Sequence, residues 1–392
     1  MQDSQDIIIV GGGVIGSACA YFLMSSTDFS GTVTVIEPDS TYQNSTTARS
    51  VGGIRQQFST PENIRMSQFA LEFLRDSEIS LAVDGLTPDL PFVANGYLLL
   101  ATEPGAAVLE SNIAIQKLEG AETRMLSPDD LHRQFPWLNV DDIAAGSFGG
   151  ANEGWTDPYA LMQAFKRKAR HLGATYREDS VADLTREGNA VVAITLASGE
   201  ILSCGTVVNA AGSHAGNIAR MAGLTIPVHP RKRFVFVFDC RDAPQNCPLT
   251  VDPCGAYFRP EGQTFICGKS PDPEDDPDCT DLEVDHGFFD EHLWPVLAHR
   301  VPAFEAIKVV NAWAGLYAYN TLDQNAIVGT HPDVTNLIFA NGFSGHGLQQ
   351  SPAIGRAVSE LAIFGEFRAL DLSRFGMQRV LDRKPLAEIN VI

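Results

Sequence analysis

Two short apolar runs, with an apolar segment of helix length between them, open the chain. Asp6–Val10 and Thr32–Ile36 are rich in β-branched residues, which predicts two buried parallel strands. The intervening residues, up to about Ser25, predict a buried helix. The charge-free run Ile7–Met24 has the length of a membrane span, but three consecutive glycines interrupt it. We therefore expect a βαβ unit here and no transmembrane segment.

A glycine pattern in the first turn of this unit predicts nucleotide binding. Gly11, Gly13 and Gly16 form the sequence G-x-G-x-x-G. The first allows a tight turn, the second lets a pyrophosphate approach the backbone, and the third lets helix and strand pack closely. The N–H groups of the helix N-terminus favour phosphate, and Glu37, after the second strand, suits the ribose hydroxyls. Since Glu37 would repel a 2′-phosphate, the pattern disfavours NADP but does not separate NAD from FAD.

Net charge and cysteine spacing restrict the partners and the compartment. The 392 residues include 28 Lys and Arg against 48 Asp and Glu, which gives a formal net charge of −20. Nucleic acid would repel such a chain, so we expect no nucleic-acid partner. The first basic residue is Arg49, and none of the seven cysteines has C-x-x-C spacing. We therefore expect no basic targeting segment, no metal site, reduced thiols and a cytoplasmic location.

Three later segments resemble flavin-binding motifs of the D-amino-acid oxidase superfamily, which includes glycine, sarcosine and dimethylglycine oxidases and dehydrogenases. Ser45–Ile54 resembles its second flavin loop, Val207–Ser213 its strand and Ala-Ala-Gly turn, and Asn341–Gln350 its C-terminal flavin motif. The resemblance covers the chain from end to end and implies FAD as the cofactor. It also implies an α/β (α+β) fold, with a Rossmann-like FAD-binding domain of the glutathione-reductase type and a second, mostly antiparallel-sheet substrate domain.

A second resemblance is to a mitochondrial branch of this superfamily, which is implicated in assembling a respiratory complex. The matching segments are Ser50–Ser59, Glu153–Pro158, Pro230–Phe234, Trp313–Tyr317 and Gly345–Gln350. An assembly or scaffolding flavoprotein, in which FAD is mainly structural, is therefore an alternative function. A flavin reductase driven by a pyridine nucleotide is a third, although the chain has no second G-x-G-x-x-G.

Because the flavin motifs lie at both ends and in the middle of the chain, we expect both domains to be discontinuous. The FAD-binding domain is predicted over 1–80, 149–226 and 321–392, and the substrate domain over 81–148 and 227–320. The acidic, proline-rich stretch Ser270–Asp281 predicts an exposed loop. The basic cluster Arg231–Arg233 is interpreted either as a solvated face or as a contact for an anionic substrate or electron acceptor.

The FAD contacts that we expect lie in the four motif regions. In the βαβ unit and the second flavin loop they are Gly11, Gly13, Val14, Ile15, Gly16, Glu37, Pro38, Ser45, Thr46, Ala48, Arg49, Ser50, Gly52 and Gly53. Further along they are Val181, Ala210, Ala211, Gly212, Gly315, Gly345, His346, Gly347, Leu348 and Gln349. A helix follows this last motif, with Ser351 and Pro352 suited to its N-cap and first position, or with a slightly earlier start. Its N-terminus would stabilise negative charge on a reduced flavin.

The resemblance implies oxidation of a C–N bond by transfer of hydride equivalents from the substrate α-carbon to flavin N5. The protein must then place that carbon, deprotonate the amine and hold the carboxylate. Candidate catalytic residues are Arg55, Tyr257, Arg259, Tyr317 and His346, because arginine binds carboxylate with two donors and tyrosine can orient it or move a proton. Arg259 could instead pair with a surface acid, Tyr257 could be packing, and His346 suits a cofactor contact better than a general base.

Several departures from the superfamily restrict the chemistry. No cysteine stands at Gly315–Tyr317 and Arg49 replaces a flavin-linking histidine, so we expect noncovalent FAD. Gln349 replaces a carboxylate-binding lysine of sarcosine oxidases, and Ile266 stands near the position of a lysine thought to help oxygen react, although Lys269 is close. We predict an FAD-dependent oxidoreductase of an amine or amino acid, with a secondary or N-substituted amine such as an N-methyl amino acid as substrate. Its electrons pass to oxygen or to a quinone or protein acceptor.

Overall fold

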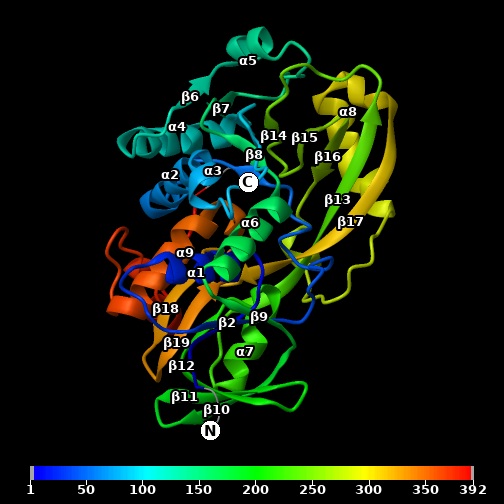
Figure 1. Ribbon diagram of the computed structural model, residues 1–392. Helices are drawn as coiled ribbons and strands as arrows, with labels where there is room; N and C mark the ends of the chain where they lie inside the picture. Colours follow the sequence, from blue (N-terminus) through cyan, green and yellow to red (C-terminus); the bar gives the residue numbers. More distant parts are fainter. Residues whose placement is uncertain (1–3, 390–392) are drawn as a thin grey trace.

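The computed structural model describes residues 4–389, which form two large sheets with helices between and around them (Figure 1). The first sheet has the order β10-β11-β12-β1-β2-β9, and β19 pairs with β12 and β18. Its strands are β1 (Ser4–Val10), β2 (Val33–Glu37), β9 (Thr175–Glu178), β10 (Val181–Glu187), β11 (Ala190–Leu196), β12 (Ile201–Asn209), β18 (Ile327–His331) and β19 (Val334–Asn341). The central strands β9, β2, β1, β12 and β19 are parallel. Burial of such strands by helices explains their β-branched composition.

The second sheet is almost entirely antiparallel, with the order β17-β13-β16-β15-β14-β5-β7-β6. Its strands are β5 (Tyr97–Ala101), β6 (Thr123–Leu126), β7 (Ala145–Gly149), β13 (Val228–Cys240), β14 (Leu249–Val251), β15 (Tyr257–Glu261), β16 (Thr264–Gly268) and β17 (Ile307–Asn320). Only the pair β14 and β5 runs parallel within this sheet of the described chain. The long pair β13 and β17 extends along one side of the molecule from the first sheet to α8 (Figure 1).

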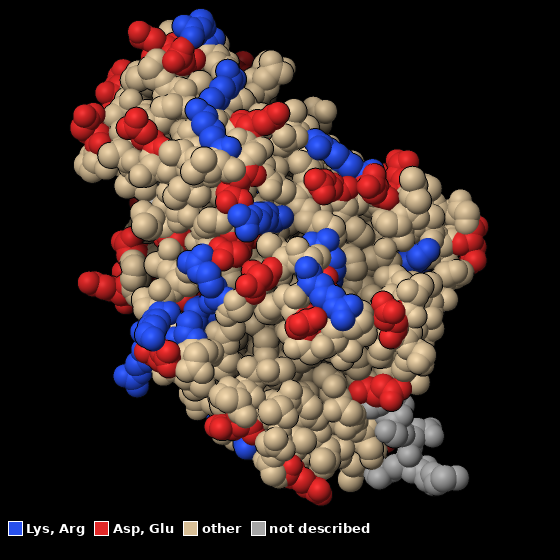
Figure 2. Space-filling model, turned by 90° about the vertical axis from the view of Figure 1, so that its left-hand side faces the viewer, with Lys and Arg blue, Asp and Glu red and all other residues tan. Residues whose placement is uncertain are grey.

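A small sheet, ten α-helices, four 3₁₀-helices and one π-helix complete the described part of the chain. The small sheet has the order β3 (Gly53–Ile54), β8 (Gly154–Thr156) and β4 (Phe92–Val93). The α-helices are α1 (Val14–Ser25), α2 (Pro61–Arg75), α3 (Ser77–Ser80), α4 (Glu103–Leu118), α5 (Pro128–Gln134), α6 (Pro158–His171), α7 (Ala215–Met221), α8 (Trp294–Arg300), α9 (Gly347–Phe364) and α10 (Met377–Leu381). Of the helices within residues 4–389, none is long and apolar enough to cross a membrane. On the face shown in Figure 2, acidic and basic side chains are interspersed.

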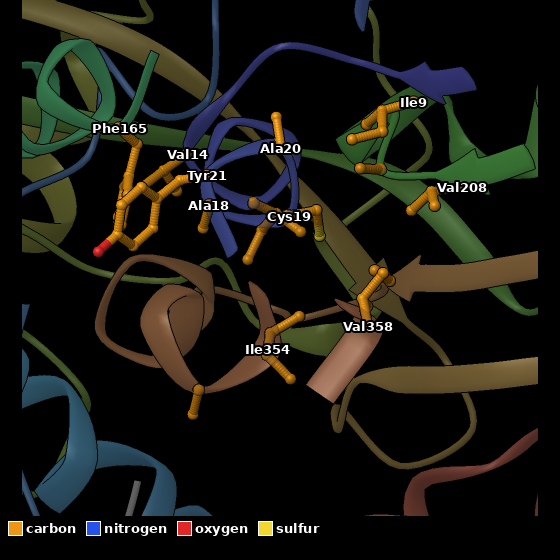
Figure 3. Packing of buried hydrophobic residues seen from close by; sticks show 14 of the residues in the cluster. Ile9, Val14, Ala18, Cys19, Ala20, Tyr21, Phe165, Val208, Ile354 and Val358 are labelled. Atoms are coloured by element: carbon orange, nitrogen blue, oxygen red, sulfur yellow. The ribbon is translucent and has the colours of Figure 1, made fainter. Parts of the chain in front are cut away.

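Helices α1 and α9 pack closely because small residues lie at their contact. Ala18 and Cys19 of α1 face Ile354 and Val358 of α9 in the same buried cluster (Figure 3). A Cβ on Gly355 would lie 2.7 Å from the Ala18 carbonyl carbon, so only glycine permits this approach. The N-termini of both helices are thereby brought to the same cavity.

The C-terminal helix has the earlier of the two starts that the sequence allowed, and Ser351 is not its N-cap. Helix α9 starts at Gly347, with His346 as its N-cap, and Pro352 lies inside it. A proline inside a helix cannot donate to the carbonyl four residues before it, here that of Leu348. The Ser351 hydroxyl donates to this carbonyl instead, at 2.9 Å. The serine thus replaces the bond that the proline removes, which allows the helix to extend towards the glycine-rich turn.

Candidate active site

A cavity of about 1070 Å³ lies where the glycine-rich turns of the first sheet meet the second sheet. The βαβ turn, the second flavin loop, the turn after β12 and the N-terminus of α9 line one part of it. Strands β15 and β17, together with the loop after β16, line another. Segments from both ends and the middle of the chain are therefore assembled around one space.

The βαβ turn leaves no room for side chains at two of its glycines. Gly11 has a φ of +99°, and a Cβ there would lie 2.4 Å from the carbonyl oxygen of Ala210. A Cβ on Gly16 would lie 1.9 Å from the carbonyl oxygen of Gly11. These contacts let β1, β12 and α1 converge at one point, and they bring the N-terminus of α1 to the cavity.

Glu37 lies at the end of β2 with its carboxylate directed at the glycine turn. Its two oxygens accept hydrogen bonds from the amides of Gly12, at 2.7 Å, and Asp39, at 3.1 Å. Burial raises the pKa of Glu37, and both hydrogen bonds favour the ionised form. A carboxylate held in this way can accept from ribose hydroxyls at the edge of the cavity.

The second flavin loop is tied to both α1 and β17. The Thr47 hydroxyl accepts a hydrogen bond from the amide of Val14 at 3.1 Å. The Thr46 hydroxyl donates a hydrogen bond to the Leu316 carbonyl at 2.6 Å. Arg49 donates to the Ala314 carbonyl at 2.7 Å, and Trp313 donates to the Arg49 carbonyl at 3.0 Å. Thr47 was not among the contacts expected from the sequence, although hydroxyl residues such as those at 45–47 commonly bond to helix N-termini.

Most of the cofactor contacts expected from the sequence line this cavity. They are Gly13, Val14, Ile15, Glu37, Pro38, Ser45, Thr46, Arg49, Ser50, Gly53, Ala210, Ala211, Gly212, Gly315, Gly345, His346, Gly347, Leu348 and Gln349. Gly11, Gly16, Ala48 and Gly52 lie beside or beneath this lining, and Val181 begins β10 outside it. The structure thus brings all four motif regions together around one space.

Arg55 is buried in the cavity wall next to the N-terminus of α9. Its guanidinium donates to the Tyr97 hydroxyl at 3.3 Å and contacts Nε2 of His346 at 3.1 Å. It also lies over the Phe58 ring, 4.8 Å from the centroid, while its amide donates to Gln349 at 2.8 Å. Among residues 4–389, no carboxylate is within ion-pair distance of this guanidinium, and its buried Nε has no partner. A buried cation in this state is suited to an anionic ligand.

The other candidates on the cavity wall are uncharged at neutral pH. Burial, assisted by Arg55, lowers the pKa of His346 to about 3, so its ring is neutral. Because the Arg55 guanidinium donates to Nε2, the hydrogen of the ring is on Nδ1. Burial raises the pKa values of Tyr257 and Tyr317 above that of a free phenol. Tyr317 also packs against the backbone of Gly345, where a Cβ would lie 2.6 Å from its ring.

Arg259 is buried outside the lining of the cavity. Its Nε and Nη2 donate to the Val51 carbonyl at 3.0 and 2.7 Å, and its guanidinium faces the Trp155 ring at 5.0 Å. It also forms an ion pair with Glu261, which is half exposed. In this arrangement Arg259 braces the backbone of the second flavin loop, and the ion pair matches the alternative interpretation of this residue.

The acidic stretch and the basic cluster, interpreted separately from the sequence, bind each other. Arg233 forms a two-pronged contact with Asp276 at 2.7 and 2.8 Å, and both side chains are about nine-tenths buried. Arg231 pairs with Asp278 at 3.3 Å, and Lys232 with Asp281 at 2.7 Å. Ser270–Asp281 is the exposed loop that the sequence predicted, with most residues exposed, and its first residues and Asp276 also line the cavity. Mutual neutralisation of charge holds the loop over β13.

A family model described as FAD dependent oxidoreductase matches residues 6–361 of the chain. The chain belongs to this family. FAD-dependent oxidoreductase domain-containing protein 1 of Xenopus laevis is 45% identical over 427 residues, covering 100% of this chain and 85% of the relative. Glycine oxidase of Bacillus subtilis is 26% identical over 403 residues, covering 99% of this chain and 100% of the relative.

Solved structures of the family share the fold. L-proline dehydrogenase from P. horikoshii matches with a TM-score of 0.86 and 26% identity over 98% of this chain and 100% of that one. Glycine oxidase from Geobacillus kaustophilus matches with a TM-score of 0.82 and 22% identity, covering 97% and 99%. These comparisons confirm the predicted fold class, with an FAD-binding domain and a mostly antiparallel substrate domain.

FAD is the cofactor typical of this family, and the cavity fits it. The Glu37 carboxylate and the N-terminus of α1 line it, and glycines leave the backbone accessible beside them. The N-terminus of α9 also lines it, and the dipole of that helix favours negative charge. Within residues 4–389, no group of His, Cys, Asp and Glu side chains could hold a metal ion. The protein is an FAD-dependent oxidoreductase of the D-amino-acid oxidase type.

Proposed function

We propose that this flavoprotein oxidises the C–N bond of an N-substituted amino acid, such as an N-methyl amino acid, whose carboxylate binds to Arg55. The observation that carries the proposal is the buried guanidinium of Arg55, which lines the cavity without a carboxylate partner among the described residues. Leaving a buried cation unpaired is costly, and a substrate carboxylate would remove that cost. A simple amine without a carboxylate would not.

The residues around Arg55 have separate tasks in this proposal. Tyr97 and His346 hold the guanidinium in place, and Gln349 holds its backbone. The phenols of Tyr257 and Tyr317 line the space beside it as neutral donors that orient the carboxylate. The chemistry that FAD supplies when bound is acceptance of hydride equivalents from the α-carbon. Gly13, Val14 and Glu37 would hold FAD, together with the second flavin loop and the N-terminus of α9.

Proton removal from the substrate amine does not require a histidine base in this site. His346 is neutral, but a pKa of about 3 makes it a weak proton acceptor. The Arg55 charge and the buried site both lower the pKa of a bound ammonium group. We therefore expect the amine to lose its proton to solvent as it binds and to react in its neutral form.

Anaerobic reduction of the purified holoprotein tests the function. The panel contains N-methyl amino acids, D-amino acids and, for each N-methyl amino acid, the matching N-methylamine without a carboxylate. We expect the flavin absorbance to bleach with one or more of the N-methyl amino acids and not with the matching amines. No bleaching across the panel would instead favour the assembly or scaffolding alternative, and bleaching by NADH would favour a flavin reductase.

We predict that the FAD is bound noncovalently. The segment Gly315–Tyr317 has no cysteine, and Arg49 stands in the second flavin loop. After acid precipitation we expect yellow FAD in the supernatant. Colour that stays with the pellet would contradict this prediction.

A further inference from the structure

Glu153, in the loop between β7 and β8, is a buried carboxylate behind Arg55. Its side chain is 1% exposed, and its two oxygens accept hydrogen bonds from the Gln56 amide and the Gln57 side chain, both at 2.7 Å. A Cβ on Gly149 would lie 2.2 Å from the carboxyl carbon. The absence of a side chain at Gly149 thus leaves room for this carboxylate, which is hydrogen-bonded to the two residues that follow Arg55.

The charge that favours ionisation of Glu153 is that of Arg55. Burial raises the pKa of Glu153 to about 7, while its hydrogen bonds and Arg55 act in the opposite direction. The neighbouring strands β5 and β7 carry no charged residue, and His346, Tyr257 and Tyr317 are neutral. The buried site therefore holds one cation and one carboxylate whose proton affinity depends on that cation.

We propose that Glu153, although beyond ion-pair distance of the Arg55 guanidinium, is coupled to it through the buried Gln56–Gln57 segment and takes up one proton from solvent when a carboxylate ligand binds to that guanidinium. This inference rests on the proposed function, in which Arg55 binds the substrate carboxylate. With ligand bound, two carboxylates would share one buried cation, and protonation of one of them relieves the repulsion. The ligand contacts the guanidinium directly and keeps its charge, so Glu153 accepts the proton. Glu153 is thus a positioning residue that acts through Arg55 and Gln57.

Titration of the oxidised holoprotein with propionate, followed by the change in flavin absorbance between pH 5.5 and 9, tests this linkage. In the wild type we expect Kd to be constant at low pH and to rise roughly tenfold per pH unit above about 7, because the ionised Glu153 must then be protonated on binding. In Glu153→Gln we expect a flat profile, close to the low-pH value. To accept from the new amide, the Gln57 side chain must turn over so that its unpartnered Oε1 replaces Nε2, and this removes its bond to the Tyr97 carbonyl. The exposed Glu122→Gln variant serves as the control and should keep the wild-type profile.

A second measurement requires no variant. Calorimetric titration at pH 8 in two buffers with different ionisation enthalpies should show uptake of about one proton per propionate bound. Equal pH profiles for the wild type and Glu153→Gln, or no proton uptake by the wild type, would overturn the role of Glu153 while leaving Arg55 as the carboxylate site. Failure of propionate to bind at any pH would overturn the proposed role of Arg55, and that of Glu153 with it.

Discussion

Replacing Arg55 by glutamine should lower kcat/KM for the proposed N-methyl amino-acid substrate by roughly 100-fold, equivalent to about 3 kcal/mol of lost charge-assisted binding. The loss should appear mainly in KM, because the interaction with the carboxylate exists before and during hydride transfer. Arg55→Lys should recover part of it, since it keeps the charge but not the two-pronged contact. Stopped-flow reduction of the flavin over a range of substrate concentrations separates the two parameters.

The Arg55 variants need controls for structure and for cofactor content. Arg75→Gln removes an exposed arginine that bonds to Asn152, and we expect unchanged kinetics. All variants should retain FAD, because the Arg55 side chain contacts Tyr97, His346 and Phe58 and no residue of the glycine turn. An Arg55→Gln protein with full FAD and wild-type KM would refute the assignment of the carboxylate to this guanidinium.

Gly16→Ala should destabilise the protein by about 3 kcal/mol or more and abolish retention of FAD. The new Cβ would lie 1.9 Å from the Gly11 carbonyl oxygen, which is backbone and cannot rotate away. Relief of this clash requires α1 to move away from β1, and that movement displaces the helix N-terminus from the phosphate-binding turn. The ratio of flavin to protein absorbance after gel filtration reports on the cofactor, and urea unfolding reports on stability.

Gly150→Ala is the matched control for Gly16→Ala. The nearest atom to a Cβ on Gly150 is in the Phe148 ring at 3.7 Å, an ordinary contact. We expect its stability to change by no more than about 0.5 kcal/mol, with full FAD. A Gly16→Ala protein with the same midpoint in urea and the same flavin content as this control would show that the close approach at Gly16 is unnecessary.

The βαβ unit could be predicted from the sequence because each of its signals is local. The strand Asp6–Val10, the helix to about Ser25 and the strand ending before Glu37 agree with β1, α1 and β2 within two residues. The spacing of its apolar residues, the spacing of its glycines and its acidic residue can all be recognised within the same forty residues. The later flavin segments could be found by resemblance, since each is also a short continuous stretch.

The partners of charged side chains could not be predicted, because they lie far apart in the chain. Arg233 and Asp276 meet only because the loop after β16 folds back over β13. Arg259 of β15 bonds to the Val51 carbonyl of the second flavin loop, because the fold places these two segments side by side, and it does not line the cavity. Glu153 carried no sequence signal as a charged group, since its importance comes from burial beside Gln56 and Gln57.

The sequence by itself therefore determined the cofactor class and the family, because a dinucleotide is recognised by backbone turns whose glycines leave a local pattern. Only the tertiary structure decided which of the candidate cations is free to bind a substrate. Arg55 and Arg259 are both buried arginines, but their environments differ in the carbonyls and carboxylates that reach them from other segments. The electrostatic role of a charged side chain depends on its burial and on neighbours that are distant in sequence. Neither can be predicted from the sequence alone.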